Sequence, residues 1–149
     1  MNSMVTEDLT DAELAARLRL ALARLTRRLR QHTPQSLSSS QVSTLASVEE
    51  LEPVRLSDLA AVEGVSLPTQ SRVVAALETH RLLVRKPDPD DGRAAQLHIT
   101  AEGRERLEQL RTERSAFLVE RLTTLTGPQR VALVGALDAL ETLAKGERA

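Results

Sequence analysis

The chain has 149 residues, of which 41% are apolar, and a formal net charge of −1, which suits one domain with a hydrophobic core. It contains no cysteine, which excludes disulfides, thiolate zinc sites and thiol redox chemistry. Phe117 is the only aromatic residue, so the core must consist of leucine, valine and alanine, which favours packed helices. Because no apolar run approaches the ~20 residues of a membrane span and the N-terminus is unlike a signal peptide, we expect a soluble cytoplasmic protein.

A capping box opens the first predicted helix, because Thr10 and Glu13 stand three residues apart. Leucines follow at positions 14, 18, 22, 25 and 29, a spacing typical of one helical face, which predicts a helix to about Gln31. Six arginines and no acid lie between residues 17 and 30. We expect this basic stretch to be a solvated face beside the leucine stripe, with an acidic partner or flanking DNA as the alternative.

A helix-turn-helix is predicted in the middle of the chain. A second capping box, Ser38 to Gln41, opens a short helix that ends before Pro53, and residues 55–62 form another short amphipathic helix. Gly64 stands where a helix ends in a left-handed turn, and Ser66 caps a further helix that continues to about His80. Two short helices around a glycine-containing turn are typical of this motif.

A β-hairpin follows, with strands at 82–86 and 96–100 joined by a loop that contains the reversal signal Asp91-Gly92. Thr100 then caps a long helix with apolar positions from Leu107 to Leu125. A third capping box, Thr126 to Gln129, opens the final helix, which carries leucines at 133, 137, 140 and 143.

The stretch "LSDLAAVEGVSLPTQSRVVAALETHRLLVRKPDPDDGRAAQLHITAEG" resembles the MarR family of bacterial and archaeal transcription regulators. Its most specific elements are "GVS-P-T-SR", "LE-HRLLVRKPDPDD-R" and "LHITAEG". The resemblance implies a mainly α fold in a single domain, 1–149, with a winged helix-turn-helix at 38–100. It also implies dimerisation helices at 8–31 and 101–145, and a homodimer that binds pseudo-palindromic operator DNA, usually as a repressor.

The near-neutral net charge argues weakly against DNA binding, but residues 66–86 hold four basic side chains against Glu78 alone. Because recognition helices present their N-terminal residues to the major groove, we expect DNA contacts from Ser66, Thr69, Gln70, Ser71 and Arg72. Capping is the competing interpretation for Ser66 and Thr69. Gln70 stands where relatives usually place an aliphatic residue, which indicates either altered helix packing or a side chain that faces DNA.

The wing gathers three aspartates around Arg93. We expect Arg93 to enter the minor groove and Asp91, two residues earlier as in the family's wing, to hold its guanidinium in place. The alternative is an ordinary surface pair worth under ~1 kcal/mol. Asp88 and Asp90 would point to solvent or restrain binding to the wrong DNA. Lys86, at the base of the wing, is expected to contact phosphate, with solvated charge as the alternative.

Nothing in the sequence predicts an enzyme, a cofactor or a metal site. The three histidines lack metal-ligand spacing, and Asp90 and Asp91 lie on an exposed turn where no shifted pKa is expected. The family implies release of DNA by a small molecule, and a pocket of aliphatic side chains and arginine would favour an anionic or aliphatic effector. Regulation without a ligand stays open. The alternative function is a helical module whose winged helix docks another protein.

Overall fold

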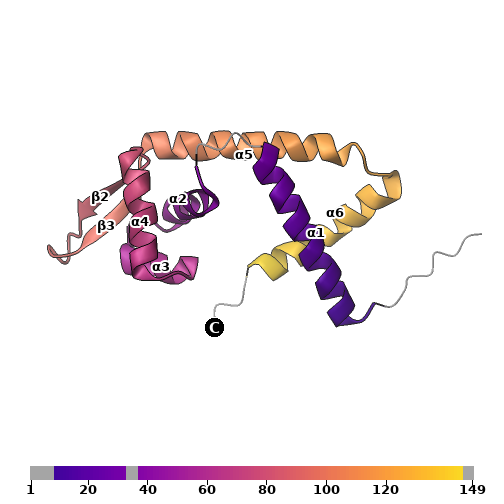
Figure 1. Ribbon diagram of the computed structural model, residues 1–149, viewed down its shortest axis with the longest axis horizontal. Coiled ribbons are helices and arrows are strands. Elements are labelled where there is room, and N and C mark those ends of the chain that lie inside the picture. The colour runs from indigo at the N-terminus through magenta and orange to yellow at the C-terminus, as the bar shows by residue number, and fades with distance from the viewer. Residues whose placement is uncertain (1–8, 33–36, 146–149) are drawn as a thin grey trace, which may run out of the picture.

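The computed structural model describes residues 9–32 and 37–145, and the expected N-terminal boundary of the first dimerisation helix, residue 8, lies outside these ranges. The elements in chain order are α1 (Asp11–His32), α2 (Ser39–Leu51), β1 (Val54–Arg55), α3 (Leu56–Glu63), α4 (Leu67–Thr79), β2 (Leu83–Pro87), β3 (Ala95–Ile99), α5 (Ala101–Leu122) and α6 (Gly127–Ala144). Figure 1 shows α2 to β3 gathered into a lobe at one end of α5, with α1 and α6 crossing near its other end. The mainly α winged helix-turn-helix fold expected from the sequence is confirmed.

Local hydrogen bonds start these helices where the sequence places their caps. All three capping boxes form; at the first, the Thr10 amide donates to Glu13 Oε2 at 2.9 Å. Gly64 ends α3 with a φ of 65°, a left-handed conformation that suits glycine. The predicted helices are therefore confirmed, although α5 ends at Leu122 and the expected apolar position at Leu125 lies in the turn before α6.

The sheet has three strands in the order β1-β3-β2, all antiparallel. The sequence predicted only the hairpin and placed Arg55 in the helix that follows, which is wrong: Val54 and Arg55 pair with Leu97 and Gln96. A two-residue strand is too short to show the alternation that marks strands in a sequence. Both hairpin strands lie within one residue of their predicted positions, and Leu97 and Ile99 are buried on one face as expected.

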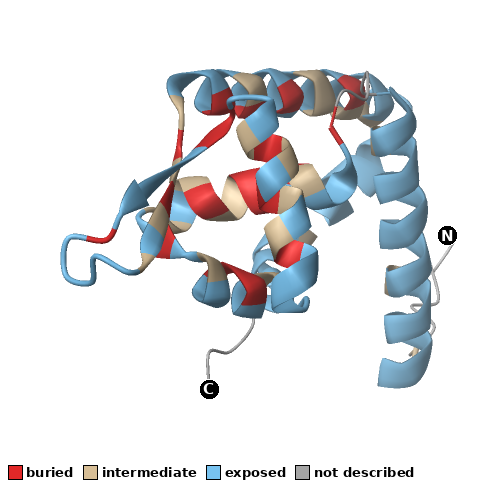
Figure 2. Ribbon diagram, turned by 60° about the vertical axis from the view of Figure 1, so that its left-hand side comes forward, coloured by how far each residue is buried: buried red, intermediate tan, exposed pale blue. Residues whose placement is uncertain are grey.

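The hydrophobic core lies inside the lobe, where Leu45, Leu59 and Leu77 are completely buried. Figure 2 shows buried residues in α2, α3, α4, the sheet and α5, whereas neither α1 nor α6 contains a buried residue. Helix α5 begins in close contact with this core: a Cβ added at Gly103 would lie 2.3 Å from the Leu82 carbonyl oxygen. The start of α5 is therefore closely packed against the core of the lobe.

Ionic contacts fasten α2 to α5 and so fix the lobe on the long helix. Arg104 pairs with Glu52, and Arg111 pairs with Glu49 at 2.8 Å. Burial alone would raise the pKa of Glu52, but hydrogen bonds from Arg104 and from the Ile99 amide outweigh it and hold this pKa below its ordinary value.

At the other end of α5, the rings of His32 and Phe117 lie 4.5 Å apart and join α1 to the long helix. Over the ranges described, no helix is both long and apolar enough to cross a lipid bilayer.

Candidate nucleic-acid interface

The first turn of α4 presents a pair of hydroxyl groups to solvent. Ser66 is the N-cap: its Oγ accepts the Thr69 amide at 3.3 Å and lies 2.8 Å from Thr69 Oγ1. Both residues are exposed, and the amides of this turn face the same end of the helix. The Ser66 hydroxyl thus caps the helix, whereas among the described residues the Thr69 hydroxyl contacts only Ser66 Oγ, and both stay accessible for further hydrogen bonds.

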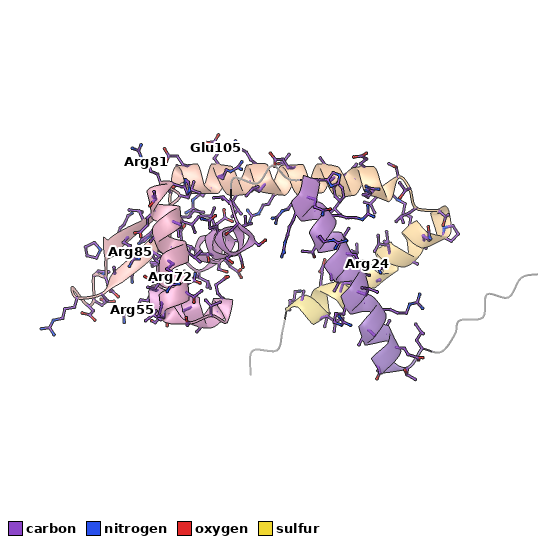
Figure 3. The ribbon with its side chains drawn as sticks, in the orientation of Figure 1. Arg24, Arg55, Arg72, Arg81, Arg85 and Glu105 are labelled. Atoms are coloured by element: carbon purple, nitrogen blue, oxygen red, sulfur yellow. The ribbon has the colours of Figure 1, made fainter. Side chains whose placement is uncertain are left out.

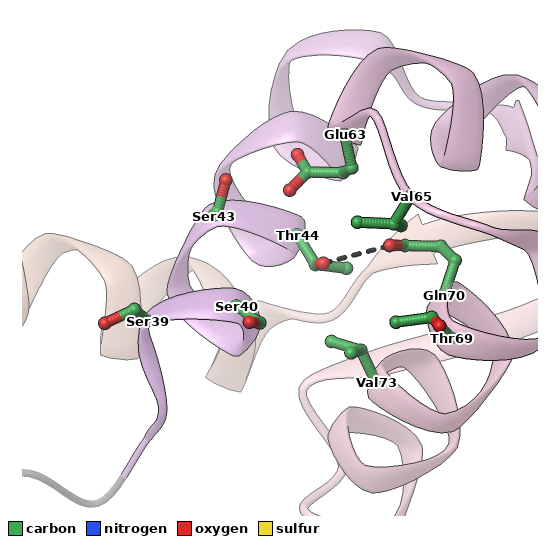
Figure 4. A pocket seen from close by; sticks show the side chains of 9 residues that line it. All are labelled: Ser39, Ser40, Ser43, Thr44, Glu63, Val65, Thr69, Gln70 and Val73. Carbon is green, nitrogen blue, oxygen red and sulfur yellow. Dashed lines mark hydrogen bonds between the residues drawn. The ribbon is translucent and has the colours of Figure 1, made fainter.

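Gln70 points into the core, so the expectation that it contacts DNA is wrong. Its side chain is 1% exposed, and its Nε2 donates to Thr44 Oγ1 of α2 at 2.9 Å (Figure 4). Thr44 is equally buried. The departure from an aliphatic residue at this position therefore marks altered packing between α4 and α2, the other interpretation that the sequence left open.

Arg72 lies on the opposite side of α4 from Gln70, because two residues along a helix correspond to a rotation of about 200°. It is exposed, whereas Ser71 beside it is half-buried. Figure 3 shows Arg55, Arg72 and Arg85 on the lobe, while Arg24 lies on α1, across the molecule. No described residue forms an ion pair with Arg72, whereas Arg85 pairs with Glu78 of α4 at 3.0 Å. The guanidinium of Arg72 is therefore available to a ligand.

Two successive side-chain-to-backbone hydrogen bonds shape the wing. Asp88 Oδ1 accepts the Asp90 amide at 2.9 Å, and Asp91 Oδ1 accepts the Arg93 amide at 3.1 Å. Aspartates favour such turns because their short side chains reach the backbone two residues on. The expected contact between Asp91 and the Arg93 guanidinium is therefore wrong: Asp91 holds the backbone, and the exposed Arg93 side chain has no partner among the described residues.

Asp88 was expected to point to solvent, and this is also wrong, whereas Asp90 is exposed as expected. Asp88 is 3% exposed, and its Oδ2 accepts hydrogen bonds from Arg55 Nη2 at 2.6 Å and Nε at 2.9 Å. The Asp90 amide and the Arg55 guanidinium hold the pKa of Asp88 below its ordinary value. This contact ties the outer end of the hairpin to β1, so the acid supports the wing and offsets the charge of Arg55 near the interface.

Lys86 is exposed but lies apart from the α4 residues. Arg85 pairs in register with Leu97, on the ribbon face that continues from the core toward α4. Side chains alternate between faces along a strand, so Lys86 lies on the other face. The structure thus brings the N-terminal residues of α4 into one group, places Arg93 at the wing tip, and places Lys86 on the face of the ribbon that does not continue toward α4.

Two residues that were not predicted from the sequence support the site through hydrogen bonds. Arg55 donates to Asp88 of the wing, and Thr44 accepts from Gln70 of α4. Signals for them were weak: an arginine directly before a helix, and a threonine among the apolar positions of α2. The Asp88-Pro-Asp90 spacing, which is typical of an Asx turn, was the more informative hint.

A pocket of about 310 Å³ lies between α1, α2 and α5, away from this interface. Its lining includes Arg30 and Arg114 together with Leu29, Val42 and Ala46. Arg114 Nε is buried and has no hydrogen-bond partner within the part of the chain that the structure describes. Within the described ranges, no three histidine or acidic residues lie close enough together to hold a metal ion.

Comparison with known proteins places these features in context. The profile of the MarR family matches residues 37–95. The HTH-type transcriptional regulator ML2140 of Mycobacterium leprae is 38% identical over 132 residues, which cover 88% of this chain and 92% of the relative.

Solved structures give the same fold. A putative transcriptional regulator of Pseudomonas aeruginosa superposes with a TM-score of 0.81 at 32% identity, covering 92% of this chain and 97% of that protein. A mutant of S. aureus MepR bound to an oligodeoxyribonucleotide superposes with a TM-score of 0.66 at 17% identity, covering 88% and 97%. At the lower of these identities the likeness concerns the fold alone.

Proposed function

Since this chain belongs to the MarR family of transcription regulators, we propose that it acts as a homodimer that binds a pseudo-palindromic operator and represses transcription from it. The observation that carries the proposal is the exposed guanidinium of Arg72 on α4, which forms no ion pair with any described residue. It lies near the hydroxyls of Ser66 and Thr69 and in the same lobe as the wing that carries Arg93. A bound dimer would exclude other proteins from the DNA that it covers.

In this proposal α4 enters the major groove. Ser66 and Thr69 would meet phosphates at the helix N-terminus, where backbone amides favour anions, and Arg72 would reach a base edge or a phosphate. Ser71, half-buried beside Arg72, would contribute its hydroxyl to the same groove. Lys86 would contact phosphate on its own face of the ribbon, and Arg93 would probe the minor groove from the wing tip.

The distribution of buried apolar residues supports the proposed division of the single domain into a DNA-binding part and a dimerisation part. The winged helix-turn-helix at 38–100 holds most of the core, and the helices at 8–31 and 101–145 would form the dimer. Leucines of α1 and α6 line an open apolar groove of about 420 Å³, among them Leu18, Leu22 and Leu137. Exposed apolar surface of this extent is typical of an interface, and a second copy would cover it.

The pocket between α1, α2 and α5 supports modulation by a small molecule. Its arginines favour an anionic group, its aliphatic lining favours a compact apolar body, and Arg114 Nε offers an unused donor. A ligand here would contact α2, which packs on α4, and α5, which is one of the proposed dimerisation helices. A protein that acts on prokaryotic DNA works in the cytoplasm, where we expect this one.

The test is selection of bound fragments from a random duplex pool, followed by binding measurements over a range of salt concentrations. We expect a palindrome, and an affinity that falls steeply with salt because counterions leave the DNA on binding. Recovery of no common sequence, together with an affinity that salt leaves unchanged, would favour the alternative in which the winged helix docks another protein.

A further inference from the structure

We propose that Gln70 and Thr44 form a polar pin that fixes the rotation and depth of α4, and thereby sets how sharply the protein distinguishes its operator from other DNA. This inference rests on the proposed function. It concerns two buried residues that touch no DNA, so both act as positioning residues.

The buried face of α4 consists of Gln70, Val74 and Leu77. Contacts made by valine and leucine are non-directional, so apolar packing by itself tolerates small rotations and translations of a helix. A hydrogen bond depends steeply on distance and angle. The 2.9 Å bond from Gln70 Nε2 to Thr44 Oγ1 is a directional contact on this face, and it favours the rotational setting of the helix at which the bond forms.

The pin lies at the reading end of α4. Gln70 is next to Thr69 and Ser71 and two residues from Arg72, whereas Val74 and Leu77 lie one and two turns further on. A shift at Gln70 therefore moves the side chains that are proposed to meet the groove more than a shift at Leu77 would. Because base contacts depend on the orientation of each donor, a misplaced helix loses sequence discrimination before it loses attraction to phosphates.

The surroundings of the pair make its hydrogen bond consequential. Gln70 and Thr44 form part of the lining of a pocket of about 240 Å³, with Ser40, Ser43 and Glu63 nearby (Figure 4). The pocket contains hydroxyls and a carboxylate, so other polar partners lie within reach if the pin breaks. An amide freed from Thr44 would turn toward them and take α4 with it, because a buried amide is rarely left without a partner.

The experiment compares four variants of the full chain, Gln70→Leu, Thr44→Val, Thr44→Ser and the double variant Gln70→Leu/Thr44→Val. Each is assayed for its melting temperature and for its affinity toward the selected operator and toward a scrambled duplex of equal length at one salt concentration. Far-UV circular dichroism establishes that each variant is folded. Val74→Ala, which weakens the same helix face without touching the pin, is the matched control.

We expect Gln70→Leu and Thr44→Val to lower the ratio of operator to scrambled affinity by about tenfold, with the scrambled affinity unchanged. Thr44→Ser keeps the hydroxyl and should keep the ratio. The double variant removes both polar groups, so it should recover the melting temperature and still discriminate poorly. Val74→Ala should lower the melting temperature and leave the ratio intact.

A double variant that recovers both stability and discrimination would overturn the positioning role, because the pair would then be merely structural. So would single variants that discriminate like the parent. If the parent itself showed no preference for any duplex, the proposed function would be wrong, and the role of the pin would be wrong as well. Measurements on the unmutated protein alone reveal this outcome, so it is distinguishable from a failure of the pin.

Discussion

The lobe that carries α4 and the two arms formed by α1 and α6 solve the problem of burial in opposite ways. In the lobe, leucines from α2, α3, α4 and the sheet are buried within one chain. In the arms, Leu14 is 53% exposed and Leu143 is 70% exposed, and neither helix buries a residue. Leucine side chains are thus buried in the lobe and exposed on α1 and α6. This contrast supports the proposal that a second copy of the chain covers α1 and α6.

The largest effect that follows from this contrast concerns Leu137, in the apolar groove between the arms. Leu137→Glu would bury an unpaired carboxylate in the proposed dimer interface, so we expect the dimer dissociation constant to rise by at least ~100-fold, with operator binding lost in parallel. Sedimentation equilibrium measures the first and a mobility-shift assay the second. Thr142→Glu, which adds the same charge outside that groove, should leave both unchanged; a Leu137→Glu dimer as tight as the parent would show that the arms pair elsewhere.

The same substitution at two glycines tests the difference in packing between the lobe and the arms, because alanine should change stability in opposite directions at the two positions. At Gly103 a Cβ would lie 2.3 Å from a backbone oxygen and 2.8 Å from Ile99 Cγ1, so Gly103→Ala should destabilise the fold by about 3 kcal/mol. At Gly135 in α6 a Cβ would meet nothing within 4 Å, so Gly135→Ala should stabilise the helix by about 0.5–1 kcal/mol. Urea unfolding measures both. If the two variants shifted stability in the same direction, the lobe and the arms would not differ in packing as described.

The sequence predicts helices and wing well because their signals are local. Capping boxes and leucine spacings depend on residues three or four positions apart, and they are found where expected. What could not be predicted depends on contacts between distant segments. Gln70 meets Thr44 across 26 positions, and Arg55 meets Asp88 across 33, so neither the inward turn of Gln70 nor the support of the wing is visible in any short stretch.

The wing shows the same limit within a single loop. The spacing of Asp91 and Arg93 correctly indicates that they interact, but it does not say which atoms do so. A carboxylate two residues before an amide reaches the backbone more readily than it reaches a long side chain that is solvated. The guanidinium of Arg93 therefore has no partner among the described residues, which sharpens its proposed role as a probe of DNA.

Arg93→Ala should weaken operator binding by about 1–3 kcal/mol and lower the slope of log affinity against log salt by about one, with the melting temperature unchanged. Binding should weaken because a positive charge that is proposed to contact DNA is lost. The melting temperature should not change because the exposed Arg93 side chain has no partner among the described residues. Fluorescence anisotropy over a salt series gives both quantities. Arg19→Ala removes the same charge from α1 and serves as the control; an equal loss in both variants would mean that net charge, and not the wing, sets the affinity.

The smallest expected effect concerns how the melting temperature depends on pH, which should differ between a carboxylate of the lobe and one of the arms. The pKa of Asp88 is held below its ordinary value by the Asp90 amide and by Arg55, so the folded state favours the charged carboxylate. The stabilisation is therefore fully present above the unfolded pKa of about 4 and is lost as pH falls through the lower folded value. We expect the melting temperature of the parent to fall below about pH 4 more steeply than that of Asp88→Asn, which cannot titrate at this position.

Glu13 of α1 serves as the control for an effect that any carboxylate with a lowered pKa would have. Hydrogen bonds from the Thr10 side chain and backbone also hold the pKa of Glu13 below its ordinary value. Glu13 lies in the exposed first turn of an arm, whereas Asp88 joins the hairpin to β1, the strand at the other edge of the sheet. Because solvent screens the exposed Glu13, Glu13→Gln should flatten the acid limb of the melting curve less than Asp88→Asn does. Should the two variants flatten it equally, Asp88 would be one more surface carboxylate, and the wing would owe its shape to the Asx turns alone.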